Sequence, residues 1–301
     1  MARSFARSIS FPLSPSRCSS KPRASAYHER SVSLPCRPHN PALAHLQAHI
    51  LGVRAWAAGP SAAIAAGLEL LASLHASLAD LLALPEAQAA LLPSSSSNGD
   101  RLLDAFLRLA DAHGCFQETL LALKRDVAEA LAAVRRRDGA RLASAVRSQR
   151  RAGKELARLA SLVRPPSSTR MMSPLGGIVG HGGSNEFCGV LMEAAAATAA
   201  ASAALFGAVA AMSASVAASA SASACSCKRT AALVCLVKTT KTKGKCSGSS
   251  SMGEEEEAAM AERLEELEEC VEEMEAGGEK VFRSLVQTRV SLLNIHTTHI
   301  F

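Results

Sequence analysis

Apolar residues recur three or four positions apart along most of this chain, which is the spacing of amphipathic helices. The most regular run lies in residues 254–296. Its apolar stripe consists of Met260, Leu264, Leu267, Val271, Met274, Val281, Leu285 and Leu292. Gly278 and Thr288 interrupt the stripe, so we expect this helix to pack inside a bundle rather than to form a free two-stranded coiled coil.

The same spacing predicts helices upstream. A first helical region begins at Pro41, and Gly59-Pro60 should break it because proline removes a helical hydrogen bond. Pro85 should end its second helix. A long helix is predicted from Asp100 to Arg137 and another from the Asp138-Gly139 turn to Val163. Strand signals are nearly absent, with one short apolar run at 231–237.

Composition limits the core that these helices can form. Hydrophobic residues make up 48% of the chain, but many are alanines, and aromatic residues are only 3%. Alanine favours helices and buries little area, so the core should be thin. The predicted fold is all-α, an elongated bundle of long amphipathic helices with a disordered N-terminal tail and Ser/Gly-rich linkers.

The expected organisation follows changes in composition along the chain. It comprises a disordered basic Ser/Pro-rich tail (1–40), N-terminal helices (41–164), a linker (165–185), an Ala/Ser-rich helix (186–224), a basic and Ser/Gly-rich linker (225–253) and the acidic helix (254–296). Residues 41–296 together form the predicted helical domain.

Charge is concentrated in separate blocks. Twelve glutamates lie between positions 254 and 275 beside a single basic residue, Arg263, and glutamates one helical turn apart repel each other. Positions 135–164 carry ten Arg or Lys residues against two acids. We therefore expect the acidic helix to pack on the basic region within one chain. Binding of acidic lipid or nucleic acid by the basic region is the alternative, and its lack of aromatic residues argues against nucleic acid.

The N-terminal tail contains the pattern Arg-Ser-x-Ser-x-Pro twice. One copy has Arg7, Ser10 and Pro12, and the other has Arg30, Ser33 and Pro35. Arginine three residues before serine suits basophilic kinases, and the phosphorylated pattern looks like a ligand of 14-3-3 phosphoserine readers. Chance occurrence in an Arg/Ser-rich tail is the alternative interpretation.

The Ala/Ser-rich stretch 194–224 is long enough to span a bilayer. Few of its residues strongly favour insertion, so a buried bundle helix is the preferred interpretation and a membrane span the alternative. Cys225 and Cys227 follow it beside a Lys/Arg run and are candidate palmitoylation sites. The cysteine spacing does not fit a compact zinc site. We find no catalytic constellation, metal site or cofactor site.

Three sets of segments carry a family resemblance. They are 30–39, the turn 135–139 with its continuation 148–151, and 264–275 followed by 281–285 and 288–295. Together they resemble a plant-specific family of unknown biochemical activity that is grouped with BYPASS-like proteins. The resemblance implies a plant source, an α-helical fold and a role in root and shoot development, and it supplies no catalytic or metal residues.

These observations favour a non-enzymatic helical interaction or regulatory protein of plant root and shoot development. Its expected partners are proteins, including 14-3-3 proteins after phosphorylation, with weak membrane association and no nucleic acid. The alternative is a membrane-associated protein anchored through 187–245. We expect a cytoplasmic location, since the scattered cysteines fit a reducing compartment. Membrane association and a plastid location are the alternatives, the latter because the start of the chain is rich in Arg and Ser.

Overall fold

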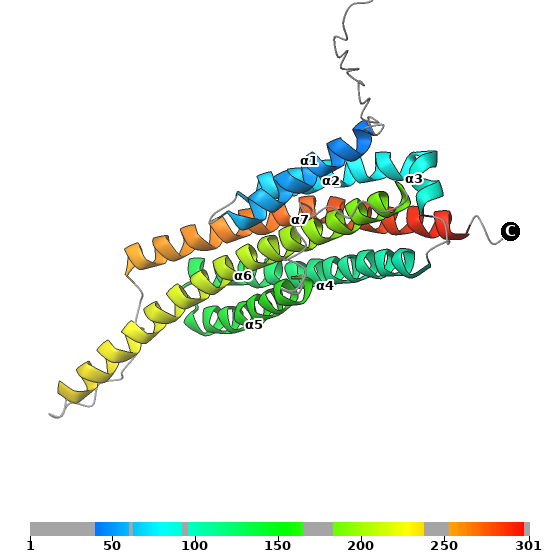
Figure 1. Cartoon of the computed structure of the whole chain (residues 1–301). Helices are drawn as coiled ribbons and strands as arrows, with labels where there is room; N and C mark the ends of the chain where they lie inside the picture. The colour runs from blue at the N-terminus through cyan, green and yellow to red at the C-terminus, as the bar shows by residue number, and fades with distance from the viewer. Residues whose placement is uncertain (1–39, 60–62, 92–95, 165–182, 238–252, 298–301) are drawn as a thin grey trace, which may run out of the picture. The chain divides into compact units, whose positions relative to one another are not determined.

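The computed structural model describes residues 40–59, 63–91, 96–164, 183–237 and 253–297, and in these ranges every regular element is a helix (Figure 1). The helices are α1 (Pro41–Ala58), α2 (Ile64–Ala83), α3 (Pro85–Ala90), α4 (Ser96–Arg135), α5 (Gly139–Val163), α6 (Gly183–Val237) and α7 (Glu254–Thr297). The predicted all-α class is confirmed. The predicted disordered tail and most of the linkers lie outside the described residues.

Helix α6 is the centre of the bundle. Helices α1, α2, α7, α4 and α5 pack side by side in that order, and α6 contacts all five. No α6 residue from Val190 to Ala210 is exposed. A helix surrounded in this way requires small side chains, because each neighbour must approach its backbone closely. The Ala/Ser composition of this stretch meets that requirement.

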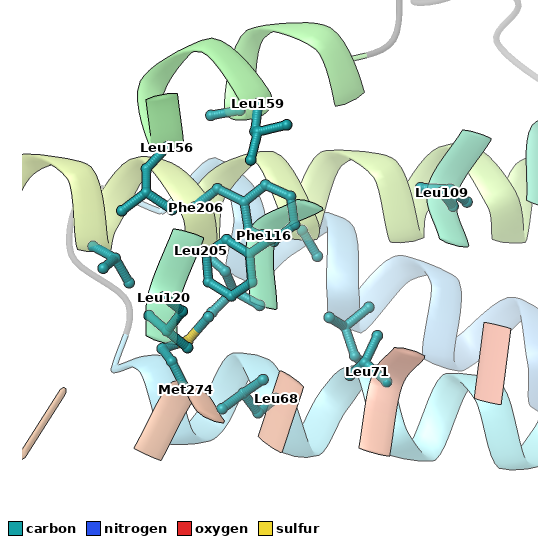
Figure 2. Close-up of a cluster of buried hydrophobic side chains, with 14 of the residues drawn as sticks. Leu68, Leu71, Leu109, Phe116, Leu120, Leu156, Leu159, Leu205, Phe206 and Met274 are labelled. Atoms are coloured by element: carbon teal, nitrogen blue, oxygen red, sulfur yellow. The ribbon is translucent and has the colours of Figure 1, made fainter. Parts of the chain in front are cut away.

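Large side chains of the surrounding helices fill the space that the alanines leave. Phe116 of α4 stacks on Phe206 of α6, with ring centroids 4.0 Å apart. Around this pair lie leucines from four helices together with Met274 of α7 (Figure 2). The labelled leucines are Leu68 and Leu71 of α2, Leu109 and Leu120 of α4, Leu156 and Leu159 of α5, and Leu205 of α6. The core is therefore one continuous cluster around α6.

Helices α5 and α6 are joined by reciprocal hydrogen bonds. Gln149 Nε2 donates to the Ser213 carbonyl oxygen at 3.2 Å, and Ser213 Oγ donates to the Gln149 carbonyl oxygen at 3.3 Å. A Cβ atom added to Gly153 would lie 3.1 Å from Ser213 Oγ. The glycine therefore permits the close approach that these hydrogen bonds need.

Helix α2 ends at Ala83, just before Pro85, as predicted. Pro85 also opens α3 from the first helical position, where proline is tolerated. Helix α4 begins at Ser96 rather than at Asp100, and it ends at Arg135. It passes without a break through His113 and Gly114.

Helix α6 is longer than the sequence indicated. It continues to Val237, past the expected end at residue 224, and includes the apolar run 231–237. No glycine or proline occurs between Ala208 and Val237, so no residue stops the helix. In contrast, Asp138 does begin α5 as predicted from the turn, and its side chain accepts hydrogen bonds from the backbone N–H groups of Ala140 and Arg141.

Because α6 is central, we expect the free energy of unfolding to depend strongly on the size of its buried side chains. Ala201 is fully buried, whereas Ala211 of the same helix is exposed. We expect Ala201→Leu to lower the free energy of unfolding by about 1–3 kcal/mol, because the added atoms overpack the centre of the bundle. Ala211→Leu, the matched control, should change it by less than about 0.5 kcal/mol. Urea unfolding followed by circular dichroism measures both, and equal effects would contradict the central position of α6.

Candidate interaction surface

The apolar stripe of α7 faces the bundle. The structure buries Met260, Leu264, Leu267, Val271, Met274, Val281, Leu285 and Leu292, and it also buries Gly278 and Thr288, the two positions that interrupt the stripe. Cβ of a side chain at Gly278 would come within 3.8 Å of Phe116, which is ordinary contact distance. At Gly278, therefore, α4 lies close to α7, and the interruption is not a gap in the packing.

Basic residues near one edge of α7 partly neutralise its glutamates. Lys124 Nζ of α4 donates to Glu275 at 2.7 Å and lies 3.6 Å from Glu272. The hydrogen bond to Glu275 is the largest cause of the raised pKa of Lys124. Farther along, Arg135 pairs with Glu265 at 3.5 Å, and Arg137 pairs with Glu257 at 3.0 Å. Most of these side chains are exposed to solvent, so each pair contributes little to stability.

The expected docking of α7 on the whole basic region is wrong. Only Arg135 and Arg137, which precede α5, reach α7. Helix α5 packs on α4 and α6 instead, so α4 lies between the basic and the acidic helix. The physical reason is that the apolar stripe of α5 matches the small-residue face of α6, and burial of apolar area outweighs exposed charge pairs.

Five glutamates of α7 remain exposed on the side away from the core. Glu255, Glu262, Glu266, Glu269 and Glu273 form this acidic stripe, and none has an ion pair with a described residue. Their spacing of three, four or seven residues places them on one helical face, where like charges repel. Because the buried side of α7 fixes the helix, the stripe presents a rigid row of carboxylates to solvent.

Two buried histidines cross-link α6 to its neighbours. His113 Nε2 of α4 forms a 2.8 Å hydrogen bond with Ser202 Oγ, and His75 Nε2 of α2 lies 3.4 Å from Thr198 Oγ1. The two α6 hydroxyls are one helical turn apart. Nδ1 of each histidine is buried without a hydrogen-bond partner among the described residues. Burial lowers the pKa of His75 to about 4 and that of His113 to about 3, so both are neutral near pH 7.

This histidine layer was missed in the sequence. A signal was present, since both residues lie within apolar stripes: His75 follows Leu71 and Leu74, and His113 precedes Phe116. A histidine at such a position needs a hydrogen-bond partner across the helix interface. The partners are a serine and a threonine in a low-complexity stretch, and nothing in the sequence singles them out.

The phosphorylation motifs with Arg7, Ser10, Pro12, Arg30, Ser33 and Pro35 lie outside the described residues. Cys225 and Cys227 lie in α6, in a part whose side chains the structure does not describe. Among the described residues, no group of three or more His, Cys, Asp or Glu side chains could hold a metal ion.

Within the described ranges, two helical segments are long and apolar enough to cross a membrane by length and composition, Ile64–Ala83 and Glu186–Ala220. In the second segment, 61% of the most apolar stretch is buried inside the bundle. The core helix of a soluble protein passes the same test, so this finding is weak evidence for a membrane span.

The described part of the chain defines a class, an all-α bundle protein built around a small-residue helix, with oppositely charged outer faces on separate helices. A family model described as Protein BPS1 matches residues 67–295, from within α2 to the end of α7. The chain belongs to this BYPASS-like family, which confirms the resemblance seen in the sequence and supports a role related to plant development. Comparisons with curated proteins and with solved structures found no match.

The buried stripe of α7 should matter far more for stability than its charges. Leu267 is fully buried, whereas Glu268 is only partly buried and has no ion pair with a described residue. Leu267→Asp should lower the free energy of unfolding by at least about 3 kcal/mol, since it places an unpaired carboxylate in the core. Glu268→Gln should change it by less than about 0.5 kcal/mol. Equal loss of helical circular dichroism in the two variants would show that the stripe is assigned wrongly.

The buried histidines predict that stability falls in mild acid. Their pKa values lie below the ordinary value of 6.5, so between pH 6.5 and 4 the unfolded chain binds more protons than the folded chain. The free energy of unfolding should therefore be highest above pH 6.5 and should drop towards pH 4 by about 6 kcal/mol, roughly half from each histidine.

The control for this pH dependence is the double variant His75→Gln/His113→Gln, measured by urea unfolding over the same pH range. Carboxylates titrate in both proteins, so the difference between the two curves isolates the histidines. Parallel curves would show that the histidines do not contribute to the pH dependence.

Proposed function

We propose that the protein is a non-enzymatic helical interaction protein that acts in plant root and shoot development. Membership of the family supports the developmental role. The observation that carries the biochemical part is the acidic stripe, a row of unpaired glutamates held rigidly on a bundle whose interior is closely packed. Such a surface is suited to a protein partner with a complementary basic face, since electrostatic complementarity provides specificity and fast association.

The experiment compares partners captured from plant tissue by the wild-type protein and by two variants. The first is Glu262→Gln/Glu266→Gln/Glu269→Gln/Glu273→Gln, which neutralises the acidic stripe. The second, with the same change in net charge, is Asp104→Asn/Asp111→Asn/Glu118→Gln/Glu129→Gln on the exposed side of α4.

We expect the stripe variant to lose its specific partners at least tenfold in abundance by quantitative mass spectrometry, because several charge pairs at an interface act together. The α4 variant should retain them. Partners that bind all three proteins equally would show that the acidic stripe is not the interaction surface.

We also propose 14-3-3 proteins as partners of the N-terminal tail. The support is the repeated motif, with Ser10 and Ser33 each following an arginine by three residues and preceding a proline by two. A 14-3-3 dimer has two equivalent grooves, and two phosphoserines in one flexible tail could occupy both. The second contact would then be intramolecular, which raises affinity by a factor on the order of 100.

Calorimetry with the full chain phosphorylated at both serines, and with the variants Ser10→Ala and Ser33→Ala, tests this proposal. The doubly phosphorylated chain should bind on the order of 100-fold more tightly than either single variant. Equal affinities would remove the two-site claim, and an absence of binding in all forms would make the motif a compositional accident.

The alternative function is that of a membrane-associated protein anchored through 187–245. The apolar character of Glu186–Ala220 favours it. The burial of that segment by five neighbouring helices opposes it, since insertion would require the bundle to open. Cell fractionation separates the two functions, because pelleting that survives both high salt and alkaline carbonate would support an anchor in α6.

A further inference from the structure

The solvent-facing side of α5 carries an uninterrupted row of cations. Arg147, Arg151, Lys154 and Arg158 lie at spacings of four, three and four residues, so they occupy one helical face, and all four are exposed. We call this row the basic stripe. It extends about 16 Å along the helix at 1.5 Å per residue. One turn beyond Arg158 the same face ends in Leu162, whose side chain is 64% exposed.

The basic stripe is only weakly neutralised by the rest of the bundle. Arg158 pairs with Glu155 of its own helix, whereas Arg147, Arg151 and Lys154 have no ion pair with a described residue. Glu118 of α4, Glu155 and the buried Asp126 line the same shallow depression as Arg151, so acids are present beside the stripe. The glutamates of α7 cannot compensate the stripe, because α4 separates the two helices.

We propose that α5 binds the surface of a membrane leaflet that contains anionic phospholipids, with the basic stripe against the headgroups and Leu162 at the acyl boundary. A straight row of cations is complementary to a laterally fluid anionic surface, where lipids can gather opposite each charge. Each Lys or Arg near such a surface strengthens binding about fivefold. This contact goes beyond the proposed protein-binding function of α7 and uses a different face of the bundle.

The contact also differs from an anchor in α6. The side chains of α6 between Val190 and Ala210 are occupied inside the bundle, so binding through α5 is peripheral and leaves the fold unchanged. The structure favours a membrane over nucleic acid because α5 has no aromatic side chain on which bases could stack.

Cosedimentation of the full-length protein with vesicles tests the charge contribution. The vesicles are pure phosphatidylcholine or phosphatidylcholine mixed with phosphatidylserine. The test variant is Arg147→Gln/Arg151→Gln/Lys154→Gln, and the control variant is Arg263→Gln/Lys280→Gln/Arg283→Gln, which removes three exposed cations from α7. Circular dichroism verifies that both variants are folded.

Wild type should bind only the vesicles with phosphatidylserine, and added salt should weaken this binding. The α5 variant should lose affinity by a factor on the order of 100, and the α7 variant should stay within about fivefold of wild type. Equal affinities of the two variants, equal binding to neutral vesicles, or no vesicle binding would each overturn the proposal. The proposal would also be overturned if the same three cations were required for binding a single-stranded oligonucleotide, or for self-association, while the protein bound no vesicles.

A second measurement locates the contact independently of other basic segments of the chain. The chain has one tryptophan, so Leu162→Trp in a Trp56→Phe background places a single reporter beside the basic stripe. Leu51 of α1 is 65% exposed, and Leu51→Trp in the same background is the matched control. Anionic vesicles with brominated acyl chains should quench and blue-shift the emission at position 162 and leave position 51 unchanged. Quenching at neither position, or equally at both, would overturn the assignment to α5.

Discussion

The structure depends on close packing around α6, a helix composed largely of alanine and serine. Five long helices and the short α3 contact it, and from Val190 to Ala210 none of its residues is exposed. Small side chains let the backbones approach, and the bulk of the core comes from Phe116, Phe206 and the leucines of the surrounding helices. Since alanine contributes little apolar area, stability relies on close packing at many small side chains rather than on the burial of a few large ones. The hydrogen bonds of His75, His113 and Gln149 to α6 fix the register of that fit.

This arrangement also determines where charge can be displayed. Helices α5 and α7 each direct an apolar stripe inward, which leaves their charged residues on outer faces, and α4 lies between them. Among the described residues, the cations that other segments bring to α7 are Lys124 and Arg135 of α4 and Arg137, which follows α4. The acidic stripe and the basic stripe therefore remain available to different partners on one rigid body. A single bundle can in this way bind the basic face of a protein through α7 and an anionic membrane surface through α5.

The all-α class and the main helices could be predicted from the sequence because apolar spacing is a local property. The burial of Met260 to Leu292 along α7 follows from the same periodicity. Which helices become neighbours could not be predicted, and charge complementarity was misleading. It indicated an α5–α7 contact, whereas packing against α6 placed α5 elsewhere. The extent of α6 and its pairing with His75 and His113 were also hidden, because a low-complexity Ala/Ser stretch has no periodic signal that distinguishes its faces.

The central claim is that the Ala/Ser-rich part of α6 is the most protected helix of the protein. Hydrogen–deuterium exchange with mass spectrometry measures this directly in the full-length chain. Peptides from residues 190–210 should exchange most slowly among the described helices, at a rate limited by global unfolding, whereas α1 and the ends of α7 should exchange faster through local opening. Exchange of residues 190–210 that is as fast as exchange in α1 would contradict the account, because a helix surrounded by five others cannot open alone.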